Sequence, residues 1–149
     1  MASASLIILL YNSPMEHTIE FFENCSEVIY LATINGDRPS LRPFGTPVLV
    51  NDKFYSMSHA GKDVVNQLAK NNYVCVVASN DAEQWLRIDC DLVDDSDNIE
   101  VKRAMISRFE WAEVAGYTLD NPDFKVYRWE NAKSVIHDVE GEILAEENF

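Results

Sequence analysis

Four side chains in the middle of the chain could together bind a small anion. Arg42 lies in a strand-like segment, and Lys62 begins a helix-like one. Ser56 and Ser58 stand just before that second segment. Arginine offers a planar fork of N–H donors and lysine a point charge, and both suit a phosphate group. A helix N-terminus adds unpaired backbone N–H groups and the positive end of the helix dipole. The sequence therefore predicts that Arg42, Lys62 and one of the two serines converge on an anion.

The charge distribution is compatible with such a site. The chain has 149 residues and a formal net charge of −13, which argues against binding to nucleic acids or to anionic membranes. Between residues 36 and 70, however, basic side chains outnumber acidic ones: Arg38, Arg42, Lys53, Lys62 and Lys70 against Asp37, Asp52 and Asp63. A basic segment in an acidic protein can attract a small anion. Chance clustering on a solvated surface explains the same pattern equally well.

Hydrophobic periodicity indicates the elements that position these residues. It predicts helices over 14–24, 62–70 and 94 to about 111, and strands over 28–34, 40–50, 53–57, 73–78, 83–93 and 125–137. A turn at Asn35-Gly36-Asp37 joins the first two strands, and a kink is expected near Glu130-Asn131. Tight turns between the first three strands exclude a parallel sheet. We therefore predict a mainly β protein of the α+β class, with six antiparallel strands in a closed or split barrel and flanking helices.

The remaining segments carry no motif that divides the chain. Without repeats or linkers, residues 1–149 are predicted to form one domain, with residues 1–13 as an extended lead-in. The apolar run in that lead-in has no basic residue before it and is too short to span a bilayer, so we expect neither a signal peptide nor a membrane span. The three cysteines lack metal-binding spacing and suggest a reducing cytoplasm. Glu110-Trp111 and the acidic tail are interpreted as solvated or packed helix surface.

Six short motifs occur in a set order between residues 30 and 88. They are Tyr30-Leu31-Ala32-Thr33 with Asn35-Gly36, Arg42-Pro43-Phe44-Gly45, Phe54-Tyr55, Gly61-Lys62-Asp63-Val64, Leu68-Ala69-Lys70-Asn71 and Gln84-Trp85-Leu86-Arg87-Ile88. Each motif alone is weakly specific. Together they resemble the pyridoxamine 5′-phosphate oxidase-like family of proteins that bind flavin mononucleotide (FMN), nearest to its nitroimidazole-resistance and general-stress-protein branch. The resemblance implies a split β-barrel, a homodimer and bound FMN.

The resemblance also implies where FMN would bind. Arg42, Lys62 and Ser58 or Ser56 would hold the phosphate. Backbone groups beside Pro43, left unused by the strand ladder, would contact the polar edge of the flavin ring. Because the ring lies across the dimer interface in this family, Trp85 and Arg87 of one subunit would reach the flavin of the other. The expected cofactor-binding residues are Arg42, Pro43, Phe44, Gly45, Ser56, Met57, Ser58, Lys62, Asp63, Trp85 and Arg87.

The implied function is that of a flavin-dependent oxidoreductase. Electrons would pass between FMN and a small-molecule donor or acceptor, with nitro compounds among the acceptors. No catalytic residue is identified. Two alternatives stay open: a non-enzymatic FMN protein for storage, sensing or electron carriage, and a split barrel that binds haem or a deazaflavin instead. The C-terminal segment lacks the basic, histidine-containing motif of pyridoxamine-phosphate oxidase, which argues against vitamin B6 oxidation.

One histidine near the predicted site has an open role. In the family that the chain resembles, some members that reduce nitroimidazoles carry a histidine two positions after the aromatic of the third strand, which here is Met57. His59 lies two residues further on, and a haem protein would need His59 or His137 as an axial ligand.

Overall fold

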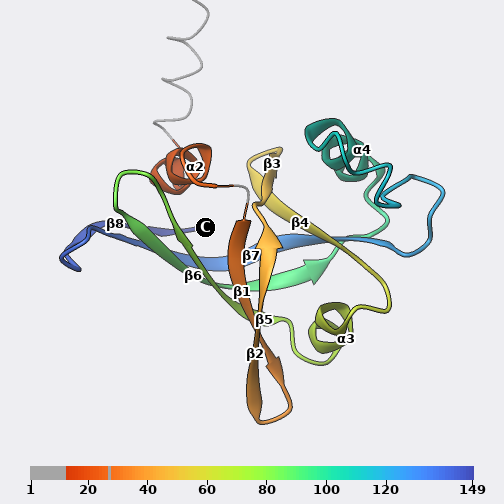
Figure 1. Ribbon diagram of the computed structural model, residues 1–149, viewed down its shortest axis with the longest axis horizontal. Helices are drawn as coiled ribbons and strands as arrows, with labels where there is room; N and C mark the ends of the chain where they lie inside the picture. The colour runs from red at the N-terminus through yellow and green to blue at the C-terminus, as the bar shows by residue number, and fades with distance from the viewer. Residues whose placement is uncertain (1–12, 27) are drawn as a thin grey trace, which may run out of the picture.

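The structure is a computed structural model that describes residues 13–26 and 28–149 (Figure 1). The lead-in expected over residues 1–13 therefore lies outside the described residues, except for Ser13. The helices are α2 (Glu16–Glu23), α3 (Asp63–Lys70) and α4 (Ile99–Arg108). The strands are β1 (Val28–Asn35), β2 (Arg38–Gly45), β3 (Val48–Val50), β4 (Lys53–His59), β5 (Tyr73–Ser79), β6 (Trp85–Asp94), β7 (Phe124–His137) and β8 (Ile143–Asn148).

The strands form one coiled antiparallel sheet, which confirms the predicted α+β class. Its order is β2-β1-β5-β6-β7-β4-β3, and β8 pairs with the free side of β7. Figure 1 shows the β1–β2 hairpin projecting downward from the sheet. Helices α3 and α4 both lie on the right of this view. The described residues contain eight strands rather than the expected six.

Two differences account for the strand count. The segment 40–50, expected as one strand, is divided between β2 and β3 at Thr46 and Pro47. Pro47 has no N–H to donate to a ladder, and the chain there leaves β1 to pair with β4 on the other side of the sheet. The acidic tail, expected as helix surface or solvated chain, forms β8. Glu147 of β8 is buried and accepts a hydrogen bond from the backbone N–H of Thr18 in α2 at 2.8 Å.

Strand β7 is bent, as the sequence predicted. Asn131 has a positive φ of 53°, and the pairing with β6 shifts register between Asp89 and Asp91. Before the bend β7 pairs with β4, and after it with β8, while β6 runs beside both halves. One long strand therefore connects the two halves of the sheet.

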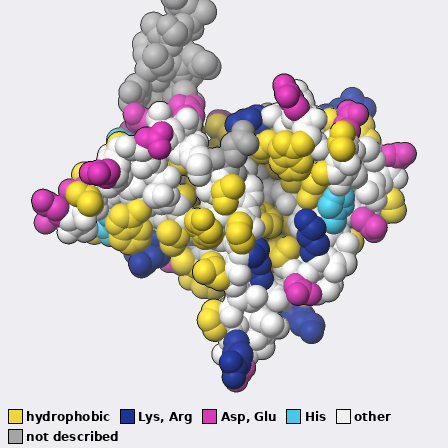
Figure 2. All heavy atoms as spheres, in the orientation of Figure 1, with side chains coloured by type: hydrophobic (Ala, Val, Ile, Leu, Met, Phe, Trp, Pro, Cys, Tyr) yellow, Lys and Arg dark blue, Asp and Glu magenta, His cyan; other side chains and the backbone are white. Residues whose placement is uncertain are grey.

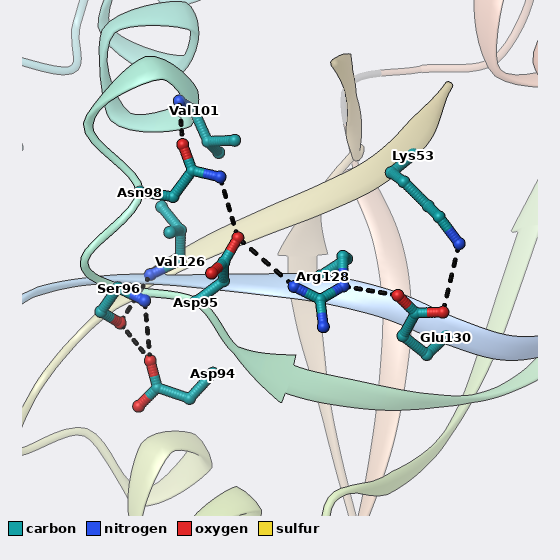
Figure 3. A network of polar contacts seen from close by, with 9 residues as sticks. All are labelled: Lys53, Asp94, Asp95, Ser96, Asn98, Val101, Val126, Arg128 and Glu130. Atoms are coloured by element: carbon teal, nitrogen blue, oxygen red, sulfur yellow. Dashed lines mark hydrogen bonds and ion pairs between the residues drawn. The ribbon is translucent and has the colours of Figure 1, made fainter. Parts of the chain in front are cut away.

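Helix α4 is tied to the sheet by a chain of polar contacts (Figure 3). Asn98 caps the helix by accepting the Val101 N–H at 3.1 Å, and it donates to Asp95 at 2.9 Å. Asp95 pairs with Arg128 of β7 at 3.5 Å, and Arg128 also binds Glu130. The helix ends at Arg108 rather than near Trp111 as expected, because Phe109 is extended and turns inward.

Buried apolar side chains form two separate clusters. The large core lies between the sheet and helices α2 and α3, and includes Ile29, Leu31, Val76, Leu86, Ile88 and Trp129. The small core lies under α4 and consists of Val50, Tyr55, Val101, Met105, Phe109, Ala112, Tyr117, Phe124 and Val126. The small core places the segment after α4 across the open end of β4.

Candidate functional site

A pocket of about 380 Å³ lies between β2, β4, the start of α3 and the segment after α4. Figure 2 shows this region as a hollow with basic (dark blue) and histidine (cyan) side chains at its rim. Most of the residues expected to bind the cofactor line it: Arg42, Pro43, Phe44, Gly45, Ser56, Met57, Ser58 and Lys62. The fold therefore brings together residues that are up to twenty positions apart in the sequence.

Arg42 is held at the pocket wall by four neutral acceptors. Its Nη1 donates to Thr33 Oγ1 at 2.8 Å and to the Leu31 carbonyl at 3.3 Å. Its Nη2 donates to Ser40 Oγ at 2.9 Å and to Gln67 Oε1 at 2.8 Å. A guanidinium has five N–H donors, so only the Nε–H remains for a ligand. The fork that the sequence analysis assigned to an anion is occupied by the protein itself.

The charge of Arg42 has no carboxylate partner among the described residues, in contrast to that of Arg128. Burial lowers the pKa of Arg42, and the nearby charge of Asp63 raises it. An arginine stays protonated under such shifts, so Arg42 presents a full positive charge at the wall of the pocket. Asp63 itself begins α3 and does not line the pocket.

The two serines of β4 differ in their hydrogen bonding. Ser56 is buried and accepts the indole N–H of Trp129 at 2.8 Å. Ser58 is buried as well, but within the described part of the chain its Oγ has no partner. A buried hydroxyl without a partner costs about 1–3 kcal/mol. Because Ser58 lines the pocket, a ligand there can supply the missing partner.

Lys62 stands at the N-terminal cap of α3. Its backbone is extended, with φ −73° and ψ 148°, and no side chain caps the helix. The side chain is exposed and lines the pocket. The start of α3 therefore offers an exposed ammonium group and the positive end of a helix dipole to the pocket that Ser58 also lines.

An aromatic wall closes the far side of the pocket. It consists of His59, Phe109, Trp111 and Tyr117, with Met105 beside them. Of these residues only His59 is a candidate for a chemical role from the sequence. Trp111, expected as solvated or packed helix surface, is half exposed, but it lies beyond the end of α4 at Arg108 and lines the pocket. The sequence did show three aromatic residues, Phe109, Trp111 and Tyr117, close to Gly116. No local pattern, however, indicated that this segment packs beside β4.

His59 is fixed within this wall. Its ring stacks on Tyr117, and its Nε2 lies 2.9 Å from the carbonyl oxygen of Ala115. A carbonyl only accepts, so Nε2 carries the proton in this contact. Gly116 has a φ of 90°, and a Cβ there would lie 3.4 Å from His59 Cε1. A Cβ would therefore make an ordinary van der Waals contact with the imidazole, and it is the positive φ that favours glycine at this turn.

Trp85 and Arg87 lie away from the pocket of their own chain. Trp85 stacks on His137 with ring centroids 4.2 Å apart, and the Arg87 guanidinium lies 5.4 Å from the Trp85 ring centre. They belong to a sheet face with exposed apolar side chains: Val28, Tyr30, Leu41, Tyr73 and Val77. Figure 2 shows hydrophobic groups gathered over this part of the sheet.

Solved structures with the same arrangement decide the fold family. No protein-family model and no curated protein matches the chain. A NimC/NimA family protein from Clostridium acetobutylicum shares 28% identity with a TM-score of 0.82, covering 94% of this chain and 96% of that one. A general stress protein 26-related protein of the pyridoxinephosphate oxidase family, from the same organism, has 16% identity and a TM-score of 0.65, covering 89% and 91%. The chain has the pyridoxamine 5′-phosphate oxidase-like split-barrel fold.

A solved structure with this fold is also named for heme storage. The heme storage protein HutZ from Vibrio cholerae has 18% identity and a TM-score of 0.60, covering 78% of this chain and 89% of its own. The fold alone therefore does not select the ligand. Among the described residues of this split barrel, no group of three or more His, Cys, Asp and Glu side chains could hold a metal ion. No helix in the same residues is long and apolar enough to cross a membrane.

Proposed function

We propose that this split barrel binds FMN in the pocket beside Arg42 and acts as an oxidoreductase on a small molecule. The observation that supports it most is a pocket in which, among the described residues, an arginine has no carboxylate partner and a buried serine hydroxyl has no hydrogen-bond partner. Both features fit a phosphate group, which carries charge and accepts hydrogen bonds. When bound, FMN supplies the redox chemistry by taking up and giving away electrons.

Three side chains of the pocket bind the phosphate. Ser58 donates its hydroxyl proton, Arg42 donates its Nε–H and contributes charge, and Lys62 adds an ammonium group at the start of α3. Hydrogen bonds to charged groups contribute about 1.5–3 kcal/mol each. The phosphate thereby gains partners that water would otherwise supply.

Strand β2 offers backbone groups to the polar edge of the flavin ring. It lies at the end of the strand order, and within the part of the chain that the structure describes it pairs with β1 alone, so one side of its backbone has no strand partner there. Pro43 and Gly45 are exposed there and line the pocket. On the opposite side, Tyr117 and Trp111 keep water away from the ring and leave room for a flat small molecule.

The functional unit is a homodimer formed through the apolar sheet face. Leu41 is 69% exposed, Tyr30 50% and Val77 39%. They stand on the adjacent strands β2, β1 and β5, so their exposed side chains belong to one face of the sheet. A contiguous apolar face of this kind marks an interaction surface. A second copy placed against it brings Trp85 and Arg87 of the partner subunit to the flavin, as the family resemblance implies.

Haem is the alternative ligand with a named precedent in the fold, and the histidines do not favour it. An axial ligand must point into the pocket that holds the haem. Of the two histidines only His59 lines this pocket, and its Nε2 is engaged by the Ala115 carbonyl, whereas His137 stacks on Trp85 away from the pocket. A deazaflavin carrying phosphate would fit the anion site as well as FMN, so the ligand must be identified directly.

The test is a titration of the apo protein with FMN, followed by flavin fluorescence, with the mass measured in solution on the same sample. We expect one FMN per chain in a dimer. Oxidation of the reduced flavoprotein by quinones and nitro compounds then separates an oxidoreductase from a carrier. A Soret band in the purified protein, or no saturable FMN binding, contradicts the proposal.

A further inference from the structure

Gln67 of α3 connects the anion end of the pocket to two strands. Its Oε1 accepts from Arg42 Nη2 at 2.8 Å and also from the hydroxyl of Thr33. Thr33 in turn accepts from Arg42 Nη1 at 2.8 Å, and it is buried. One amide oxygen therefore fixes an arginine of β2 and a threonine of β1 against the same helix. None of the sequence motifs indicated this role.

The chemical type of the acceptor matters more than its position. A glutamate has almost the same shape as a glutamine but would bring a negative charge next to the guanidinium. Arg128 is an arginine with such carboxylate partners, because Asp95 and Glu130 both form ion pairs with it. The charge of Arg128 is thus neutralised within the protein. The hydrogen-bond acceptors of Arg42 among the described residues are all neutral oxygens.

We infer that Gln67 is a positioning residue that fixes Arg42 at the pocket without cancelling its charge, and so makes the site select flavins that carry a phosphate. This inference rests on the proposed function, because it assigns the phosphate to Arg42. The neutral amide oxygen fixes the position of the guanidinium and places no negative charge near the phosphate. Any carboxylate at this position competes with the phosphate for the same guanidinium.

The experiment compares FMN with riboflavin, which has the same ring and ribityl chain but no phosphate. Both are titrated against the wild-type chain and against Gln67→Glu. We expect the substitution to weaken FMN binding about tenfold or more, since a negative charge is placed near the phosphate. Riboflavin affinity stays the same, because riboflavin does not need the charge of Arg42. The melting temperature does not fall, since the introduced carboxylate gains an ion pair with the guanidinium.

A matched control tests whether any added charge on α3 has the same effect. Asn66→Asp makes the same amide-to-carboxylate change one residue earlier, at an exposed position that is not among the hydrogen-bond partners of the Arg42 side chain in the described residues. It should change the ratio of FMN to riboflavin affinity by less than about threefold, since solvent screens an exposed charge. A third variant, Gln67→Leu, removes the acceptor without adding charge, and should lower the ratio less than Gln67→Glu does.

The outcomes distinguish this inference from the function on which it rests. If the wild-type chain binds FMN no more tightly than riboflavin, the phosphate site is wrong and the inference falls with it. If the wild type prefers FMN and Gln67→Glu keeps the same preference, only the inference is overturned. If Asn66→Asp lowers the ratio of FMN to riboflavin affinity as much as Gln67→Glu does, the inference is also overturned, because any negative charge on α3 then has the same effect. Should Gln67→Glu fail to fold, an unchanged preference in Gln67→Leu overturns it instead.

Discussion

The imidazole of His59 stacks on the phenol ring of Tyr117, with ring centroids 4.0 Å apart and planes inclined by 25°. The pair joins the end of β4 to the segment after α4, which are separated by more than fifty residues in the chain. Burial raises the pKa of Tyr117, so the phenol remains neutral beside the imidazole. The wall of the pocket is thus held by a contact between its own two halves.

Replacing this imidazole should loosen the wall. His59→Ala removes a ring stack and the hydrogen bond to Ala115, and we expect the free energy of unfolding to fall by about 1–2 kcal/mol. Urea unfolding monitored by tryptophan fluorescence measures this change. His17→Ala is the control, because the His17 side chain is half exposed and its polar contact among the described residues is an ion pair with Glu16. If both variants lower the free energy of unfolding by the same small amount, His59 does not stabilise the wall of the pocket.

Ser58→Ala should have opposite effects on stability and on binding. Removing a buried hydroxyl without a partner should stabilise the apo protein by about 1 kcal/mol, while FMN binding weakens about tenfold. Ser56→Ala is the matched control on the same strand. It leaves the indole N–H of Trp129 without an acceptor and should destabilise the protein. Thermal melts without FMN and a fluorescence titration measure both effects; an apo protein destabilised by Ser58→Ala counts against a free hydroxyl.

The apolar sheet face can be tested by adding charge to it. Val77→Glu should convert the dimer to a monomer, because a carboxylate would have to be buried in the interface. Light scattering after size exclusion gives the mass. Val114→Glu makes the same change at a residue that is 94% exposed on the α4 side, and it should leave the mass unchanged. A dimer that persists in Val77→Glu would place the interface elsewhere.

Stability should fall at alkaline pH because of Cys75. Burial raises the pKa of its thiol from 9.0 to about 11, and the nearby Asp89 adds to this. The unfolded chain then loses the thiol proton first, so unfolding releases a proton between these two pKa values. The stabilising contribution is complete below pH 9 and is lost as the pH rises to 11. Urea midpoints from pH 8 to 11 should fall less steeply in Cys75→Ser; identical slopes would exclude this thiol as a cause.

The sequence predicted the elements that depend on local signals. The helix over 62–70 and the strand over 73–78 each agree with the structure to within one residue at either end. The bend near Asn131 was predicted as well. Strand β8 was not, since its sequence is acidic and exposed, and its stabilising contacts come from distant residues. Glu147, for example, binds the backbone of α2 about 130 residues earlier in the chain.

Only the part of the candidate site that depends on local sequence signals was predicted. Arg42, Ser58 and Lys62 come from one continuous motif region, and the pocket contains all three. The aromatic wall arises only when the small core folds the segment after α4 back over β4. Gln67 was missed because a glutamine on a helix gives no signal until its oxygen is placed beside a guanidinium.

The separation of the two cores has a kinetic consequence. The pocket is bordered on one side by Met105, Phe109 and Tyr117, all of the small core, and on the other by strands that the large core supports. Regions with few buried apolar contacts open locally at a lower free energy than the elements of a large core. We therefore expect amide hydrogens of α4 to exchange faster than those of β1 and β5, and more slowly once FMN is bound. In that case a transient opening of one corner, with the barrel intact, sets how quickly the cofactor enters and leaves.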